Sequence, residues 1–191
     1  NAQELVNVGP GDVVLVMGAG PIGCMHVRLA RALGAVHVTL ADINSHRLEL
    51  SARAVKPDAV IDMSSSDIEQ EVANIIPAPG PSVVITAAPA GAAQEQAIRM
   101  VRPGGRVSFF GGLPKDKPLI TIDSNLVHYK ELILAGANGS TPEHNRRALA
   151  LMAEGRVPVA DLLTHRVALD NVREAIELVL GGQAIKVVVE P

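Results

Sequence analysis

Short apolar runs rich in β-branched residues alternate along the chain with longer amphipathic stretches. Each short run is almost continuously apolar, which is typical of strands that are covered on both faces of a parallel sheet. The alternation therefore predicts an α/β fold, with a doubly wound parallel sheet of six strands and helices on both of its faces. The predicted strands are Asp12–Met17, Val36–Ala41, Ala59–Asp62, Ser82–Thr86, Arg106–Phe110 and Leu132–Ala137.

Helical periodicity separates these strands. Apolar residues recur on one face of a predicted helix that begins after Gly20 and ends at Gly34. Asn44 is the predicted N-cap of a second helix, because its side chain can accept a hydrogen bond from the first turn. A third helical pattern ends at the turn sequence Pro103-Gly104-Gly105.

The pattern changes beyond Gly136. Thr141-Pro142 predicts the first turn of a helix that continues to about Glu154. A short apolar run, an amphipathic helix and a final strand over Ala184–Val189 follow. We therefore predict two parts: a domain over residues 1–138 and a C-terminal helix-strand extension over residues 139–191.

Composition narrows the range of functions. Of the 191 residues, 48% are hydrophobic and 19% charged, a balance that excludes an intrinsically disordered chain. The formal net charge is −3 and aromatic residues make up only 2%, so the chain has neither a basic field nor stacking platforms for nucleic acid. No apolar run approaches the ~20 residues that a membrane span needs. We predict neither a nucleic-acid partner nor a membrane partner.

Cys24 is the only cysteine, which excludes an internal disulfide and a multi-cysteine zinc cluster. We therefore expect a reducing, cytoplasmic environment. The sequence begins at Asn1 rather than Met, and we expect it to be a piece of a longer protein.

The first predicted strand leads into Gly18-Ala19-Gly20-Pro21-Ile22-Gly23, a Gly-x-Gly-x-x-Gly sequence that opens the first helix. In a dinucleotide site, one such glycine makes the tight turn, one lets the main chain approach a pyrophosphate, and one allows close packing of helix and strand. The helix N-terminus offers unpaired N–H groups to the phosphates. An ordinary tight turn would also use glycine, but the position between strand and helix favours a Rossmann-type dinucleotide site.

Asp42 follows the second predicted strand, about 20 residues after the glycines, where such a site places an acidic residue. Its carboxylate is predicted to accept hydrogen bonds from the adenosine ribose and to repel a 2′-phosphate, which favours NAD over NADP. Asp42 could also serve as a helix cap. Arg47, five residues further on, would instead attract a phosphate, so these residues leave the cofactor choice open.

The fifth predicted strand runs into Phe110-Gly111-Gly112, and glycines at this end of a strand let the main chain approach a ligand. A flexible loop explains the same residues equally well. The chain lacks His-Glu-x-x-His, Cys-x-x-Cys and the serine nucleophile elbow. We therefore predict no catalytic and no metal-ligating residue in this chain. Of the six histidines, only His128 and His165 are candidates for a functional role.

Taken together, these segments resemble the zinc-type medium-chain alcohol and polyol dehydrogenases. The resemblance is carried by the glycine sequence with Asp42, by Arg102-Pro103-Gly104-Gly105-Arg106, by Phe110-Gly111-Gly112-Leu113-Pro114 and by the segment Leu163–Val167. It covers essentially the whole chain. Within the family the chain is most similar to the sorbitol/iditol 2-dehydrogenase branch, with threonine dehydrogenases nearby.

The resemblance implies that thirteen residues bind the cofactor. The glycine sequence would hold the pyrophosphate, Asp42 and Arg47 the adenosine end, and the main chain after the fifth and sixth strands the nicotinamide end. These residues are Gly18, Gly20, Pro21, Ile22, Gly23, Asp42, Arg47, Phe110, Gly111, Gly112, Ala137, Asn138 and Gly139. The sequence departs from the family pattern at one place. Ala88-Pro89 replaces the usual Thr-Gly of the relatives, which removes a hydroxyl near the nicotinamide.

The resemblance also implies zinc, which would polarise the oxygen of an alcohol while the nicotinamide takes the hydride. The zinc ligands are expected in an N-terminal domain that precedes this segment in the family. We therefore expect the chain to be the cofactor-binding part of an NAD-dependent oxidoreductase that acts on a polyol or secondary alcohol. By itself it is expected to bind no stoichiometric zinc and to turn over no substrate. Residues 139–191 would pack against the N-terminal domain.

Two other functions remain open. A non-catalytic NAD(H) sensor would use the same crevice, and an S-adenosylmethionine methyltransferase would also have a glycine-rich loop and an acidic residue after the second strand. The complete glycine pattern and the C-terminal segment favour the dehydrogenase.

The sixth predicted strand, Leu132–Ala137, is expected at the edge of the sheet. In the family that edge pairs with a second copy, and we expect a homodimer or homotetramer formed through residues 132–137. The segment beyond Gly139 is expected to expose an apolar face.

Overall fold

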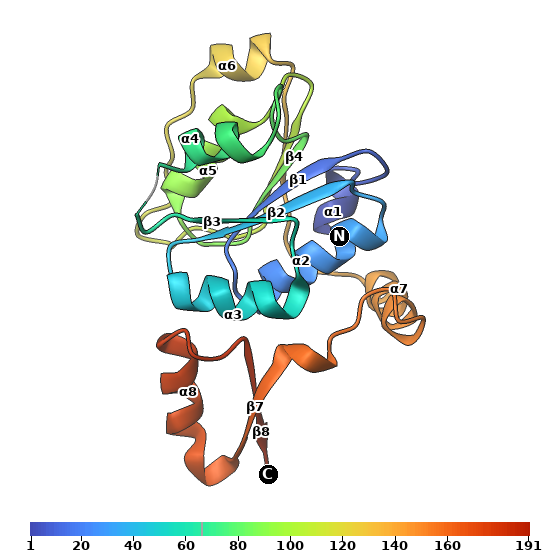
Figure 1. The fold of residues 1–191 in the computed structure, drawn as a ribbon, viewed down its shortest axis with the longest axis vertical. Helices are drawn as coiled ribbons and strands as arrows, with labels where there is room; N and C mark the ends of the chain where they lie inside the picture. The colour runs from blue at the N-terminus through green and yellow to red at the C-terminus, as the bar shows by residue number, and fades with distance from the viewer. Residues whose placement is uncertain (66) are drawn as a thin grey trace.

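The computed structural model describes residues 1–65 and 67–191. Its main sheet has six parallel strands in the order β3-β2-β1-β4-β5-β6 (Figure 1). The strands are β1 (Val13–Met17), β2 (His37–Asp42), β3 (Ala59–Asp62), β4 (Val83–Thr86), β5 (Arg106–Phe109) and β6 (Ile133–Gly136). The predicted doubly wound parallel sheet is confirmed, and each predicted strand ends within one residue of the observed one.

Helices cover both faces of this sheet. The longer ones are α2 (Pro21–Ala32), α3 (Ser45–Val55), α4 (Ile68–Ile75) and α5 (Gly91–Met100). The side chains of β1 alternate between the two layers: Val16 belongs to the core under α2 and α3, and Met17 to the core under α4 and α5. This alternation is the two-residue period of a strand, and it explains why β1 is apolar throughout.

The sequence analysis does not predict three of the helices, which are α1 (Ala2–Leu5), α4 and α6 (Ser124–Tyr129). Helices α1 and α6 carry too few apolar positions to show a period, and they depend on caps and packing. In α4, by contrast, Ile68, Val72 and Ile75 recur at helical spacing, a signal that the sequence analysis missed. The side chain of Asp67 accepts a hydrogen bond from the N–H of Glu69 at the start of α4, 2.9 Å away. Asp123 does the same for the N–H of Asn125 in α6.

The C-terminal segment forms a smaller unit outside the main sheet; in Figure 1 its first helix lies to the right, and its strands and its last helix lie below the sheet. It consists of α7 (Pro142–Ala153), the 3-10 turns η1 (Ala160–Leu162) and η2 (Leu169–Asn171), β7 (Leu163–Ala168), α8 (Val172–Leu180) and β8 (Lys186–Glu190). Strands β7 and β8 pair in parallel as a separate two-stranded sheet. The predicted helix-strand extension is therefore present.

An apolar face of this segment is open to solvent, as the sequence predicts. Ile176, Val179 and Leu180 on α8 have exposed fractions of 54%, 50% and 80%. They line a shallow hollow between α8 and β8. Uncovered apolar side chains on consecutive turns of one helix are characteristic of a surface that another protein part covers.

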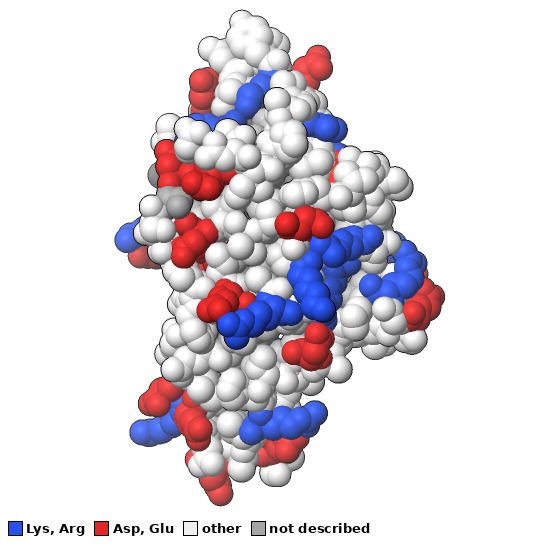
Figure 2. All heavy atoms as spheres, in the orientation of Figure 1, with Lys and Arg blue, Asp and Glu red and all other residues white. Residues whose placement is uncertain are grey.

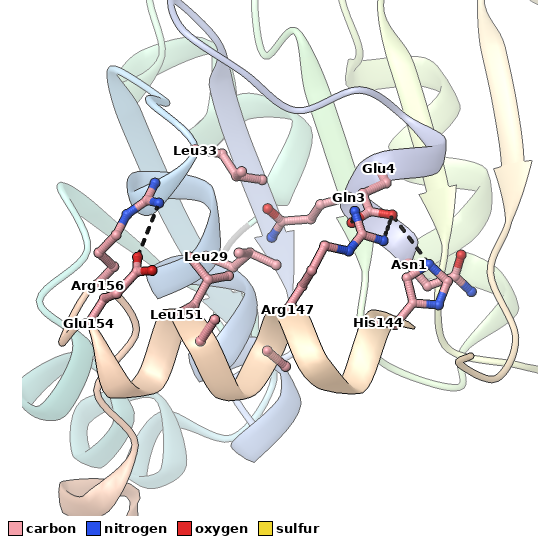
Figure 3. Close-up of a pocket in the computed structure, with 12 residues that line it drawn as sticks. Asn1, Gln3, Glu4, Leu29, Leu33, His144, Arg147, Leu151, Glu154 and Arg156 are labelled. Atoms are coloured by element: carbon pink, nitrogen blue, oxygen red, sulfur yellow. Dashed lines mark hydrogen bonds and ion pairs between the residues drawn. The ribbon is translucent and has the colours of Figure 1, made fainter. Parts of the chain in front are cut away.

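Polar contacts fasten α7 to the body of the molecule. None of the residues of α7 is buried. Its Arg147 and His144 both reach the carboxylate of Glu4 on α1, at 2.8 Å and 3.3 Å (Figure 3). Between these contacts and Arg156 lies a hollow of about 360 Å³ whose walls include Leu29 of α2. The helix is thus held at its ends and spans a gap in the middle.

None of the helices built by residues 1–65 and 67–191 is both long and apolar enough to cross a membrane.

Candidate functional site

The carboxyl ends of the six parallel strands meet at one edge of the main sheet, and the strand order reverses between β1 and β4. Ligands of doubly wound sheets bind in the crevice at this reversal. A cavity of about 510 Å³ lies on the β1–β2 side of it and is bounded by the ends of these strands and the start of α5. Three predicted residues, Gly18, Asp42 and Arg47, line this cavity together.

The three glycines of the Gly-x-Gly-x-x-Gly sequence, which connects β1 to the first turn of α2, have three different geometric roles. Gly18 has φ +119°, which favours glycine, and a side chain there would contact the Ala87 main chain at 3.0 Å. A Cβ on Gly23 would lie 1.8 Å from the carbonyl oxygen of Gly18, so the helix packs on the loop only without it. Gly20 is different, because nothing lies within 4 Å of the position of its Cβ. The open space at Gly20 is where a pyrophosphate can approach the main chain.

The N-terminus of α2 opens at the same place. Gly20 is its N-cap and no side chain caps the helix, while Pro21 occupies the first turn. The N–H groups of Ile22 and Gly23 have no acceptor among the residues that the structure describes. The first turn also lacks an acidic residue. These features leave two donors and the positive end of the helix dipole available to an anion.

Asp42 is 3% exposed and its carboxylate is fully engaged. Oδ2 accepts hydrogen bonds from the N–H of Ala19 at 2.6 Å and from Nε of Arg47 at 3.1 Å. Oδ1 accepts from the N–H of Asn44 at 2.8 Å and from Nη2 of Arg47 at 2.6 Å. A carboxylate has about four acceptor positions, so a ribose hydroxyl reaches Asp42 only where Arg47 withdraws.

This ion pair changes the expected electrostatics of the site. The guanidinium of Arg47 offsets the charge with which Asp42 alone would repel a 2′-phosphate. Arg47 is partly exposed and borders the cavity, so it can turn toward a ligand. The alternative role of Asp42 as a helix cap is wrong: the cap of α3 is Asn44, whose side chain accepts a hydrogen bond from the N–H of Arg47 at 2.9 Å.

The remaining predicted residues follow β5 and β6, on the other side of the reversal. The N–H of Gly111 donates to the carbonyl of Thr86 at the end of β4, at 2.7 Å. The N–H of Ala137 donates to the carbonyl of Phe109 at 3.2 Å. The side chain of Asn1 donates to the carbonyls of Asn138 and Gly139. The structure thus places all the predicted residues at the carboxyl edge, in two groups that flank the reversal of strand order.

Several residues that line the cavity were not predicted from the sequence. Met63 follows β3 and Gln96 lies on α5, and both line the cavity beside Asp42. The position of Met63 directly after a predicted strand is a signal that could have identified it. No comparable signal marks Gln96, because only the packing of α5 brings it to the crevice. Ala88 and Pro89, noted in the sequence as a departure from the relatives, line the same cavity.

Two ionisable side chains in the interior, those of His26 and Cys24, have shifted pKa values. Burial lowers the pKa of His26 to about 4, with a smaller contribution from the positive amino terminus, so this imidazole is neutral near pH 7. Its ring meets Phe110 edge-on, with centroids 4.9 Å apart. Burial also raises the pKa of the Cys24 thiol, which disfavours a thiolate nucleophile. The candidate His128 instead contacts the ring of Tyr129, and His165 bonds Thr164.

Within residues 1–65 and 67–191, no three His, Cys, Asp or Glu side chains come together as possible metal ligands. The charged surface is mixed in sign: Figure 2 shows Lys and Arg interspersed with Asp and Glu across one face. Gly18, Asp42 and Arg47 come together at the cavity beside the glycine loop.

The chain matches a family model described as zinc-binding dehydrogenase over residues 21–154. This range begins inside the glycine loop and extends through α7. It includes β2 to β6 and therefore most of the crevice.

Individual proteins match over nearly the whole chain. The L-threonine 3-dehydrogenase of Pyrococcus horikoshii is 34% identical over 193 residues, which cover 98% of this chain and 54% of the relative. The structure of the alcohol dehydrogenase TADH from Thermus sp. ATN1 has a TM-score of 0.91 at 28% identity, and the match covers 100% of this chain and 54% of that one. A structure described as a zinc-binding dehydrogenase from Sinorhizobium meliloti 1021, bound to NADP, has a TM-score of 0.89 at 28% identity over 100% and 55%. The chain spans about half the length of the proteins it matches.

Proposed function

The chain belongs to the zinc-binding dehydrogenase family, and we propose that it is the cofactor-binding part of an oxidoreductase that transfers hydride between a polyol or secondary alcohol and NAD. The threonine dehydrogenase relatives support the substrate class, because the hydroxyl of threonine is a secondary alcohol. NAD supplies the hydride acceptor, C4 of its nicotinamide ring. This chain would bind and orient the dinucleotide.

One observation carries the proposal. The open position at Gly20 faces the uncapped first turn of α2, so a pyrophosphate that approaches the loop meets the free N–H groups of Ile22 and Gly23. The adenosine half then extends toward Asp42 and Arg47 in the cavity of about 510 Å³. The glycines, the helix N-terminus and the acidic residue thus fit the parts of a dinucleotide in the order in which they are linked.

We propose NAD as the cofactor, with Asp42 as the group that holds the adenosine ribose. Binding in this manner requires Arg47 to leave the carboxylate and to pack beside the adenosine. The buried position of Asp42 supports the proposal, because the carboxylate keeps its two main-chain hydrogen bonds from Ala19 and Asn44 and stays oriented when Arg47 moves. NADP remains the competitor to test, because the same movement would bring Arg47 toward a 2′-phosphate.

Zinc does not fit the residues described in this chain, which form no group of three possible ligands. We propose that the ligands of the zinc in the complete enzyme come from a part of the protein outside these 191 residues. Residues 139–191, with the open apolar face on α8, would pack against that part. This chain alone would then bind the dinucleotide without oxidising an alcohol.

We also propose that the edge strand β6 pairs with a second copy of the chain. Within residues 1–65 and 67–191 the strand has a neighbour on one side only, and Ile133 on it is 55% exposed. An uncovered apolar edge is prone to pairing, and a two-fold axis would close it. Light scattering of the wild type and of Ile133→Lys tests this proposal. The wild type is expected to be a dimer or larger and the variant a monomer; a monomeric wild type at high concentration contradicts it.

Calorimetric titration of the folded chain with NADH, NADPH and S-adenosylmethionine tests the proposed function. We expect saturable binding of NADH at one site per chain, weaker binding of NADPH, and no binding of S-adenosylmethionine. A sample with a cooperative melting transition that gives no heat with NADH at millimolar concentration would overturn the proposal. Tighter binding of NADPH than of NADH would overturn the NAD assignment alone.

A further inference from the structure

We propose that Gln94 is a positioning residue for the nicotinamide half of the site. Gln94 lies on α5, and its side chain donates a hydrogen bond to the carbonyl of Gly111. This hydrogen bond fixes the main chain that follows β5, which is where we expect the nicotinamide half of a dinucleotide to bind. The inference rests on the proposed function and extends it to a residue that no sequence motif marks.

The position of the second half follows from the sheet itself. The adenosine side of the crevice is at β2, where Asp42 lies, and the pyrophosphate side is at the loop after β1. A dinucleotide that continues in the same direction crosses the reversal and passes over the ends of β4 and β5. Neighbouring strands are about 4.8 Å apart, so the path from β2 to β5 is roughly 14 Å long. The loop Phe110–Gly112 stands at the end of this path.

Gln94 contacts this loop from the helical layer that contains α5. The residue is 6% exposed, and its Nε2 donates a hydrogen bond to the carbonyl oxygen of Gly111 at 3.0 Å. It lies in the first half of α5, the helix that directly follows the loop after β4. A buried amide is costly unless it is hydrogen-bonded, so this contact is a defined feature of the fold rather than a surface encounter.

The hydrogen bond completes a three-point attachment of Gly111. The N–H of Gly111 is held by the carbonyl of Thr86 on β4, at 2.7 Å. A Cβ at Gly111 would lie 2.5 Å from the carbonyl oxygen of Ala88, so only glycine packs this closely on the β4–α5 loop. With its carbonyl held by Gln94 as well, neither peptide group of Gly111 can rotate freely.

This attachment sets the direction of a free donor. The carbonyl of Gly111 and the N–H of Gly112 belong to one peptide group, and in a trans peptide they point in opposite directions. The N–H of Gly112 has no acceptor among the described residues, and the position of a Cβ on Gly112 is open. Gln94 therefore keeps this N–H turned away from α5 and available to an acceptor such as the carboxamide oxygen of a nicotinamide.

Phe110, which precedes Gly111, contacts the helical layer on the opposite face of the sheet. His26 on α2 meets the ring of Phe110 edge-on, and Phe110 packs against the core under α2 and α3. The loop after β5 is thus held from both faces of the sheet, by an aromatic contact on one side and by the Gln94 hydrogen bond on the other. Only the second of these acts directly on the main-chain groups.

The test compares two ligands that differ only in the nicotinamide. NADH contains it and ADP-ribose lacks it, while both carry the adenosine and the pyrophosphate. Gln94→Met replaces the amide by a side chain of similar length without a donor. Gln70→Met is the matched control, because Gln70 is exposed on α4, outside the site. Binding of both ligands to wild type and to the two variants is measured by calorimetry, and the fluorescence of bound NADH reports the surroundings of the ring.

We expect Gln94→Met to weaken NADH binding about fivefold, the effect of one lost neutral hydrogen bond, and to leave the affinity for ADP-ribose within about twofold. The fluorescence of bound NADH should move toward that of free NADH. Gln70→Met should match the wild type in every measurement. Equal losses of affinity for both ligands would mean that Gln94 has a merely structural role, and unchanged affinities would mean that it has none; either result overturns the inference. Failure of wild type to bind either ligand would instead refute the proposed function.

Discussion

Arg28 on α2 and Asp161 in η1 are 133 residues apart in sequence and share two hydrogen bonds, of 2.7 Å and 2.6 Å. The same guanidinium donates to the carbonyls of Ala54 and Pro158. Only 9% of the Arg28 side chain is exposed. The contact also holds the pKa of Asp161 below its usual value, chiefly through the hydrogen bond from Arg28. One arginine therefore joins α2, the end of α3 and the part of the C-terminal segment around η1.

Arg28→Met should loosen the C-terminal segment. The variant leaves two carbonyls and a carboxylate without their donor, and we expect a loss of about 2 kcal/mol in the free energy of unfolding. Amide hydrogen exchange should become faster in β7 and β8 while the main sheet keeps its protection. Arg31→Met on the same helix is the control, because Arg31 makes one exposed ion pair with Asp58. Equal exchange in the two variants would contradict the prediction.

Gly20 and Gly23 should respond to alanine in opposite ways. Gly20 has φ −71° and open space at its Cβ, so Gly20→Ala should change the free energy of unfolding by less than about 1 kcal/mol. It should nevertheless weaken NADH binding about tenfold, because the methyl group occupies the approach of the pyrophosphate. Gly23→Ala should cost about 3 kcal/mol of stability, since its Cβ would overlap the carbonyl of Gly18.

Thermal melting and NADH titration of both glycine variants test the predicted effects on stability and on NADH binding. A Gly20→Ala protein that binds NADH as tightly as wild type would show that the pyrophosphate does not lie over this loop. A Gly23→Ala protein with wild-type stability would show that α2 can shift away from the loop.

Arg47→Ala should increase the preference for NAD over NADP. Removal of the guanidinium frees two acceptor positions on Asp42 and leaves its charge uncompensated. We expect NADPH binding to weaken about tenfold and NADH binding to stay equal or become tighter. Arg53→Ala, on the same helix and paired with Glu49 at the surface, is the matched control. A parallel loss of affinity for both cofactors would contradict the prediction, because it would mean that the packing of Arg47 beside the adenosine outweighs its effect at the 2′ position.

The stability of the fold should decrease between pH 6.5 and pH 4. The unfolded chain protonates His26 near its ordinary pKa of 6.5, whereas the folded chain does so only near 4, because burial disfavours the cation. Within this window the unfolded state binds more protons, so stability is full above pH 6.5 and falls as the pH is lowered. At pH 5 the loss from this residue is about 2 kcal/mol.

Denaturant unfolding from pH 7.5 to pH 4.5 checks the role of His26. His26→Gln should flatten the decrease in stability over this range, and His46→Gln, at an exposed position on α3, should leave it as in wild type. The slope with pH is the informative quantity, since the substitution shifts the absolute stability as well. A His26→Gln slope equal to that of wild type would contradict the lowered pKa.

The apolar runs of the sequence determined the six strands, because a strand buried on both faces needs apolar residues at every position. The glycine sequence and Asp42 likewise indicated the crevice, since their spacing reflects local turn geometry that few other residues permit. The family resemblance also came from these local segments, and the family match over residues 21–154 confirmed it. The short helices α1 and α6 left no periodic signal and were not predicted.

The contacts between distant residues were decided only by the tertiary structure. Nothing in the spacing of Asp42 and Arg47 shows that their side chains pair and that the guanidinium takes two acceptor positions of the carboxylate. Gln94 meets Gly111 because α5 packs on β4 and β5, and Arg28 meets Asp161 because the C-terminal segment returns to α2. Local sequence patterns indicate which residues are buried and which backbone geometry they adopt, because both depend mainly on the residue itself and its neighbours in the chain. The partner of a buried polar group depends on how the elements pack, and that is a property of the whole fold.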